Sequence, residues 1–210
     1  MRTWTRDRGR QAGLATFCAL LAFCRLAEPA GVDTKLAPST GSGTIPNVDL
    51  ITHENTPVRF YDDLVKGKVV LVNFMYTTCD GLCPRTTANL VRVQAALGER
   101  VGRDIFLYSI TMDPEIDTPE VLKRYAEDIG AKPGWTFLTG RRGTIERLRR
   151  RLGVSDRDPV IDADKTQHSG VLVYGNEALD RWAMMPGLTT PEFIAARVLH
   201  VAPGGRRRTE

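Results

Sequence analysis

The stretch that decides the fold is VVLVNFM at residues 69–75, followed at once by YTTCDGLCP at residues 76–84. The first seven residues form a nearly continuous apolar run, which is typical of a strand that is buried on both faces of a sheet. From Pro84 onward, apolar side chains recur at helical spacing until Gly98, and a proline is tolerated in the first turn of a helix. The pattern therefore predicts a strand-to-helix junction with two cysteines in the connection.

Strands and helices continue to alternate on both sides of this junction. A hairpin is expected before it, from residues 48–51 and 57–60. After it we expect a strand over 105–110, a helix that begins at Asp117-Thr118-Pro119-Glu120, and a strand or edge segment over 135–138. A further helix is expected through Ile145, Leu148 and Leu152. The chain is then expected to form a hairpin of 171–174 with 181–184, joined through Gly175-Asn176, and a last helix over 190–201 whose apolar face consists of Phe193, Ile194, Val198 and Val201. This order predicts an α/β, thioredoxin-like fold with a central mixed sheet flanked by helices and an added N-terminal β-hairpin.

Length and composition agree with one globular domain. The chain has 210 residues, of which 42% are hydrophobic and 26% charged, and this excludes collagen-like, coiled-coil and fully disordered chains. The net charge is +4, but the first 30 residues hold five arginines against two acidic residues. Residues 31–210 are therefore left at about +1, which argues against nucleic acid as a partner.

The N-terminus has the pattern of an export segment. Arginines at positions 2, 6, 8 and 10 precede an uncharged stretch from Ala12 to Cys24. At about 1.5 Å per residue this stretch is short for a ~30 Å hydrocarbon core, so export is the simplest interpretation, with residues 1–30 as either a signal or an uncleaved anchor in the membrane. The expected parts of the chain are residues 1–30 for export, 31–47 as a flexible tether, 48–201 as the folded domain and 202–210 as a basic tail.

Export limits what the cysteines can do. Cys18 and Cys24 lie inside the export segment, so the mature chain keeps Cys79 and Cys83. In an oxidising compartment such a pair can be a structural disulfide, a redox pair or part of a metal site. The start of the following helix is expected to lower the pKa of the Cys83 thiol, because its free N–H groups and dipole favour the thiolate.

Four motifs in order resemble those of the Sco/SenC family of copper proteins, which assist the assembly of cytochrome c oxidase. Residues 74–84, FMYTTCDGLCP, look like the family's C-x-x-x-C-P signature, and residues 109–120 and 135–140 are similar to its second and third motifs. Gln167-His168-Ser169 stands where the family has its ligand histidine. The family often has Asp at the position of Gln167, and Pro at the position of Asp80.

The resemblance implies a copper site made of Cys79, Cys83 and His168, exposed at the end of the central strands. Thiolates suit Cu(I) and an imidazole keeps Cu(II) acceptable, so this ligand set fits either oxidation state. The implied protein is an exported, periplasmic metallochaperone that delivers copper during oxidase assembly. Its implied partners are a copper-receiving subunit of a respiratory oxidase and another copper carrier or a thiol reductant.

The alternative function is that of a thiol-disulfide oxidoreductase. Cys79 and Cys83 would then reduce cysteines of the oxidase or of another copper protein. His168 separates the two functions, since a redox pair does not require it.

Other candidate side chains are assigned structural roles. His53 and His200 are expected to be surface or packing residues, and Met112, Met184 and Met185 to be core residues. Asp113 and Asp117 are expected to be turn and cap residues ahead of any role beside the metal or a partner. The solvated face of a helix is expected to consist of Arg147, Arg149, Arg150 and Arg151.

Overall fold

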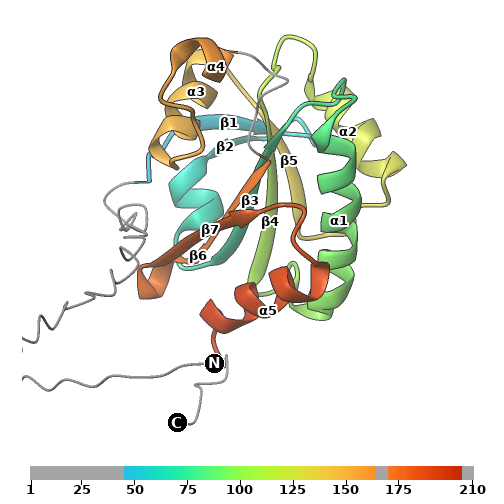
Figure 1. Ribbon diagram of the computed structural model, residues 1–210, viewed down its shortest axis with the longest axis vertical. Helices are drawn as coiled ribbons and strands as arrows, with labels where there is room; N and C mark the ends of the chain where they lie inside the picture. The colour runs from blue at the N-terminus through green and yellow to red at the C-terminus, as the bar shows by residue number, and fades with distance from the viewer. Residues whose placement is uncertain (1–44, 164–169, 205–210) are drawn as a thin grey trace, which may run out of the picture. The chain divides into compact units, whose positions relative to one another are not determined.

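A mixed β-sheet forms the centre of the computed structural model, which describes residues 45–163 and 170–204 (Figure 1). Within these ranges the sheet has seven strands in the order β2-β1-β5-β4-β3-β6-β7. The strands are β1 (Asp49–Thr52), β2 (Pro57–Arg59), β3 (Val69–Met75), β4 (Ile105–Thr111), β5 (Trp135–Thr139), β6 (Val171–Asn176) and β7 (Arg181–Pro186).

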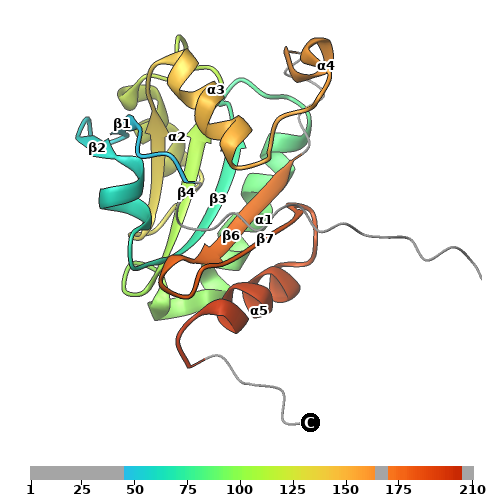
Figure 2. The same cartoon turned by 90° about the vertical axis from the view of Figure 1, so that its left-hand side faces the viewer.

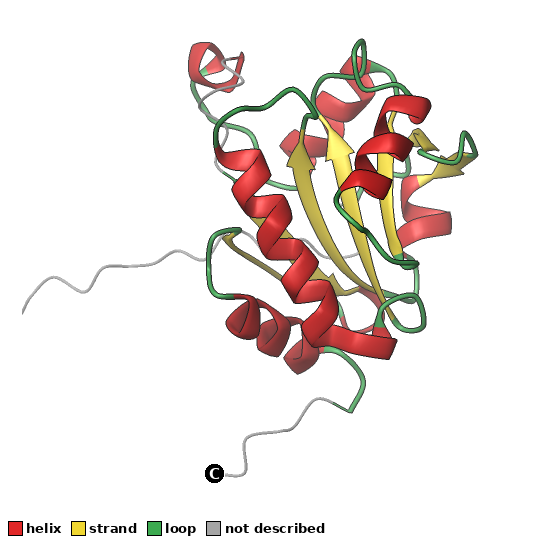
Figure 3. Ribbon diagram, turned by 90° about the vertical axis from the view of Figure 1, so that its right-hand side faces the viewer, coloured by secondary structure: helices red, strands yellow, loops and turns green. Residues whose placement is uncertain are grey.

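Helices cover both faces of the sheet. They are α1 (Leu82–Leu97), α2 (Pro119–Asp128), α3 (Arg142–Arg151), α4 (Pro159–Ala163) and α5 (Pro191–Val201), with short helical turns η1 (Phe60–Val65), η2 (Gly98–Arg100) and η4 (Glu177–Leu179). Apolar side chains of α1, α2 and α5 pack into one core, and those of η1 and α3 pack into the other. Figure 3 shows the face with α1 and α2, and Figure 2 shows α3 on the opposite face.

The apolar run at residues 69–75 is the middle of the sheet. β3 pairs in parallel with β4 and antiparallel with β6, and all seven of its residues are buried. Because side chains alternate along a strand, Leu71 enters the core under α1 while Val72 enters the core under α3. The predicted doubly buried strand and the α/β fold with a mixed sheet are confirmed.

The N-terminal hairpin extends the sheet. β1 pairs antiparallel with β5, with Ile51 opposite Thr139 and Thr52 opposite Leu138. β5 therefore lies inside the sheet, between β1 and β4, so of the two expected alternatives it is a strand and not an edge segment. The sequence predicts the hairpin but not the strand with which it pairs.

The turn between β6 and β7 differs from the expected one. Gly175 and Asn176 belong to β6, and the chain turns at η4 and at Asp180, whose φ of 48° is left-handed. A Cβ on Gly175 would lie 2.4 Å from the Trp182 ring, so the glycine makes room for that ring. The Asn176 amide donates to the carbonyl of Val201, 2.7 Å away, and is buried by α5.

Two expected side-chain positions are also corrected. Phe193 was expected on the buried face of the last helix, but 52% of it is exposed, while Ile194 and Val198 fill the core. Arg149 was expected on a solvated face, but its guanidinium is largely covered and pairs with Asp162 at 2.6 Å. This ion pair attaches α4 to α3, and α4 could not be found from apolar periodicity.

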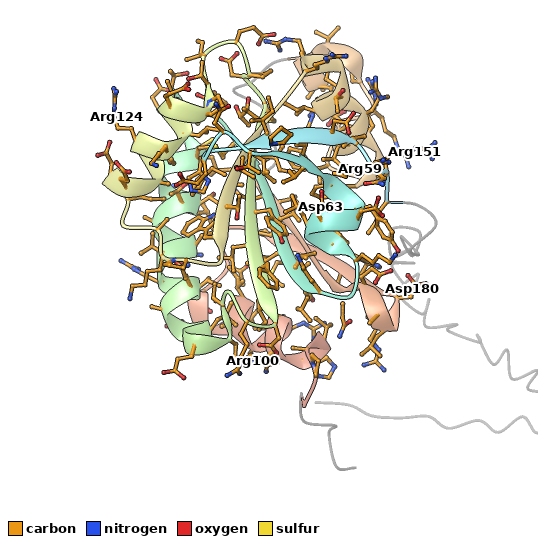
Figure 4. The ribbon with its side chains drawn as sticks, turned by 180° about the vertical axis from the view of Figure 1, so that it is seen from behind. Arg59, Asp63, Arg100, Arg124, Arg151 and Asp180 are labelled. Atoms are coloured by element: carbon orange, nitrogen blue, oxygen red, sulfur yellow. The ribbon has the colours of Figure 1, made fainter. Side chains whose placement is uncertain are left out.

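Positive charge is distributed over the described surface. In Figure 4, Arg100, Arg124 and Arg151 come from different elements and lie far apart in the view. No helix within 45–163 or 170–204 is both long and apolar enough to cross a membrane. The expected export segment lies outside the described residues, and the division of the chain into segment, tether, domain and tail stays a prediction.

Candidate metal centre

The two cysteines lie where β3 ends and α1 begins. Cys79 is in the loop of residues 76–81, and its backbone N–H donates to the carbonyl of Tyr76 at 3.3 Å. Cys83 is the second residue of α1, after the N-cap residue Gly81. The two cysteines are not joined by a disulfide, and only 8% of Cys79 and 2% of Cys83 are exposed. The predicted strand-to-helix junction is confirmed, but these two side chains are buried rather than exposed.

The two thiols differ in their tendency to ionise. Burial opposes ionisation of Cys79 most strongly, but hydrogen bonds from the Cys83 thiol and from the backbone N–H groups of Cys83 and Gly81 lower the pKa of the Cys79 thiol overall. At Cys83, burial and then the neighbouring Cys79 raise the pKa to about 12. Cys79 is therefore the thiol that ionises first as the pH rises.

The expectation that the helix start lowers the pKa of Cys83 is wrong. The N–H groups at the start of α1 act on Cys79, which precedes the helix and accepts from them. Cys83 stands inside the first turn, where Met75, Leu90 and their neighbours in the core cover it. Backbone hydrogen bonds also lower the pKa of Cys83, but burial and the neighbouring Cys79 outweigh them.

A hydroxyl group that sequence reasoning missed also reaches the thiols. Tyr76 is buried, and burial together with a hydrogen bond to Cys79 raises the pKa of its phenol well above the ordinary value. The available signal was a hydroxyl-bearing residue three positions before a cysteine, at the point where a buried strand ends. Alone, that signal does not separate a contact with sulfur from ordinary packing.

The second motif approaches the cysteine loop from β4 and α2. The N-cap of α2 is Thr118, whose hydroxyl accepts from the N–H of Val121 at 3.4 Å. Asp117 closes a turn onto the carbonyl of Asp113 through its N–H, as expected of a turn residue, and its carboxylate also accepts hydrogen bonds from Thr77, two residues before Cys79. Asp113 is buried and pairs at 3.4 Å with Arg142 of α3.

His168 lies outside the described residues. The described chain resumes at Gly170, where a Cβ would lie 2.3 Å from Leu82, the residue that separates Cys83 from the loop. The pairing of Asn73 with Leu172 likewise brings the start of β6 beside the end of β3. Among residues 45–163 and 170–204, no group of three His, Cys, Asp or Glu side chains could hold a metal.

The other candidates have the structural roles expected of them. Nδ1 of His53 accepts from the N–H of Phe137 at 3.2 Å, and the two rings pack edge to face, while His200 is exposed on α5. Met112 and Met184 pack against the cores and Met185 is buried within one.

The fold and the thiol pair define a class of protein, a thioredoxin-like domain with Cys-x-x-x-Cys at the junction between the central strand β3 and α1. A family model described as SCO1/SenC matches residues 40–202. The chain belongs to the SCO1/SenC family.

Relatives with known names support this assignment. A Stutzerimonas stutzeri protein named for copper binding is 31% identical over 134 residues, which cover 61% of this chain and 62% of that protein. The SCO1 homolog of Bacillus subtilis strain 168 is 37% identical over 101 residues, which cover 44% of this chain and 52% of the relative. The matches thus span between half and two thirds of these relatives.

A solved structure of a relative agrees with the fold. ScoI of Bradyrhizobium japonicum, determined with copper bound, superposes with a TM-score of 0.59 at 26% identity. The superposition covers 73% of this chain and 96% of that one. Copper is thus the metal of relatives in this family, as the resemblance predicted.

Proposed function

We propose that this chain is an exported copper metallochaperone that binds one copper ion through Cys79, Cys83 and His168. Two thiolates supply the soft ligands that Cu(I) prefers, and the imidazole makes the same site acceptable to Cu(II). Three protein ligands leave a position open, so that an acceptor can attach to the metal before the chaperone releases it.

The observation that carries this proposal is the pair of hydrogen-bonded thiols at the end of β3. Cys79 and Cys83 hydrogen-bond to each other, so one copper ion could bridge both sulfurs with little rearrangement. The contact between Gly170 and Leu82 supports His168 as the third ligand, because it brings the chain two residues after His168 next to the cysteine loop.

The names of relatives support a proposal for the destination of the copper. A solved neighbour, BsSco, is described as a member of the Sco family of cytochrome c oxidase assembly proteins. We propose that the acceptor is a copper-receiving subunit of a respiratory oxidase, and that another copper carrier or a thiol reductant prepares the site. Residues 1–30 would place the chain in the periplasm, either released or held at the membrane. An alkaline phosphatase fusion after Lys35 is expected to be active, and an inactive fusion would contradict export.

The test is a copper titration of the reduced full chain under anaerobic conditions. We expect one copper per chain by mass spectrometry, with a thiolate-to-Cu(II) absorption band for the oxidised ion. His168→Ala is expected to lose this band and to bind copper at least about 100-fold more weakly, since one of three ligands is removed. His200→Ala, which alters an exposed histidine on α5, is the matched control and should behave as the wild type.

A second candidate function is favoured by the difference between the two thiols. The Cys79 thiolate would attack one sulfur of a partner disulfide, giving a mixed disulfide and a partner thiolate that takes up a proton. Cys83 would then lose its proton and attack the Cys79 sulfur, forming the Cys79–Cys83 disulfide and releasing the reduced partner. Should His168→Ala bind copper normally and still support the oxidase, this reductase function would replace the copper chaperone.

A further inference from the structure

A buried carboxylate supports the loop that carries Cys79. Asp117 lies between β4 and α2 and has no exposed surface. It accepts hydrogen bonds from the backbone N–H of Thr77, with N and Oδ2 3.1 Å apart, and from the Thr77 hydroxyl. The hydroxyl of Thr111 donates to the same Oδ2 at 2.5 Å. We call Thr77, Thr111 and Asp117 the threonine–aspartate clamp.

The clamp is fixed from the side away from the cysteines. Thr111 Oγ1 accepts from the N–H of Asp113 at 2.9 Å, so its own hydrogen points to Asp117. The N–H of Asp117 donates to the carbonyl of Asp113 at 2.9 Å, and the N–H of Met112 donates to the carbonyl of Met75 at 2.8 Å. The bond between Met112 and Met75 joins the ends of β3 and β4, and the others fix the turn after β4, so the carboxylate is attached to the central sheet.

A clamp of this kind is costly for stability alone. A buried carboxylate is expensive unless charges or hydrogen bonds compensate it, and within the described ranges no lysine, arginine or histidine pairs with Asp117. Its compensation is the set of hydrogen bonds from Thr77 and Thr111. A loop that needed only to be covered could use apolar side chains, whereas a loop that must hold one conformation benefits from directional bonds.

Hydrogen bonds to Asp117 come from Thr77, which lies in the turn that leads to Cys79. Thr77 lies within the turn that the Cys79 N–H closes onto the Tyr76 carbonyl. Fixing both the backbone and the side chain of Thr77 therefore fixes the direction in which the turn presents the Cys79 sulfur. Without the clamp the turn could rotate while the two strands stayed paired.

We propose that Thr77 and Asp117 are positioning residues, which hold Cys79 in the geometry that places its sulfur beside Cys83. This inference rests on the proposed function for its copper readout. Supporting hydrogen bonds that orient metal ligands typically contribute about 10–100-fold to metal affinity. The same positioning sets how readily the two sulfurs meet in a disulfide, which gives a readout without metal.

The experiment compares three variants of the reduced full chain. Thr77→Val removes the hydroxyl at constant shape and is expected to weaken copper binding about 10–100-fold, to shift the thiolate-to-Cu(II) band and to change the rate of disulfide formation with oxidised glutathione. Thr77→Ser keeps the hydroxyl and should restore all three. Tyr108→Phe is the matched control, since it removes one buried hydroxyl, which donates to the Leu64 carbonyl at 2.7 Å in the other core. It should lower the melting temperature without changing the band or the rate.

The outcomes separate this inference from the proposed function. If the wild type binds copper but Thr77→Val matches it in affinity, band and disulfide rate, the positioning role is refuted and the copper function stands. If the wild type binds no copper, the proposed function fails, and the disulfide rate alone decides the positioning role. Should Thr77→Val not fold, Thr111→Val carries the same comparison, because it loosens Asp117 without altering the loop.

Discussion

The unequal ionisation of the two thiols predicts a large difference in their reactivity. Brief exposure of the reduced chain to iodoacetamide at pH 7 should modify Cys79 and spare Cys83. A thiol with a pKa of about 12 is ionised to about one part in 10⁵ at pH 7. A thiol whose pKa lies below the ordinary value of about 9 is ionised to more than about 1% at pH 7. The thiolate is the reacting species, so Cys79 should react more than about 1000-fold faster.

The assay is time-resolved alkylation followed by peptide mass spectrometry. The small difference in exposure, 8% against 2%, acts in the same direction as ionisation. Cys83→Ser should retain fast labelling, whereas Cys79→Ser should label slowly, because burial of Cys83 persists when its neighbour is removed. Unfolding in urea should make both cysteines react at similar rates. Equal rates in the folded wild type, or faster labelling of Cys83, would refute the assignment of the thiolate to Cys79.

Three further outcomes test the fold and its pH dependence. Leu122→Ala removes a fully buried side chain of α2 and should lower the free energy of unfolding by about 3 kcal/mol in urea titrations, and no measurable loss would contradict its place in the core. Gly134→Ala would put a Cβ 2.3 Å from the nitrogen of Gly102 at a φ of +91°. It should therefore lower the free energy of unfolding more than the control Gly67→Ala, where φ is +73° and no atom lies within 4 Å of the added Cβ. Equal losses of stability in the two variants would count against this close approach. The unfolded chain releases the Cys83 proton near pH 8.5, while the folded chain keeps it until about pH 12. The free energy of unfolding should therefore decrease as the pH rises between these values, and at pH 10 the loss should be about 2 kcal/mol. Cys83→Ser should remove this loss in thermal melts at alkaline pH.

Much of the fold could be predicted because the decisive strands are buried on both faces. A run such as residues 69–75 is apolar on both sides except for Asn73, so its composition alone indicates a strand buried on both faces. Caps behave similarly: Thr118 followed by Pro119 indicates where α2 begins without reference to the rest of the chain. These signals are local, and they agree with the tertiary structure.

The predictions fail where a residue distant in the sequence determines the local structure. Gly175-Asn176 has the composition of a turn, but Trp182 from the opposite strand needs the space above Gly175, and Val201 from α5 accepts from the Asn176 amide. The site shows the same limit. That Cys79 rather than Cys83 carries the lower pKa depends on which sulfur is covered by the core, and that Asp117 supports the loop depends on β4 lying beside β3.

The way the added hairpin extends the sheet bears on self-association. Open strand edges are templates for aggregation, and proteins protect them with short strands, prolines and charges. By pairing with β5, the hairpin leaves the three-residue β2, with Pro57 and Arg59, at one edge, and β7, which begins at Arg181 and ends at Pro186, at the other. Proline has no N–H to donate, and the charged ends favour water. Within residues 45–163 and 170–204, both edges of the sheet thus carry features that discourage polymerisation through strand pairing.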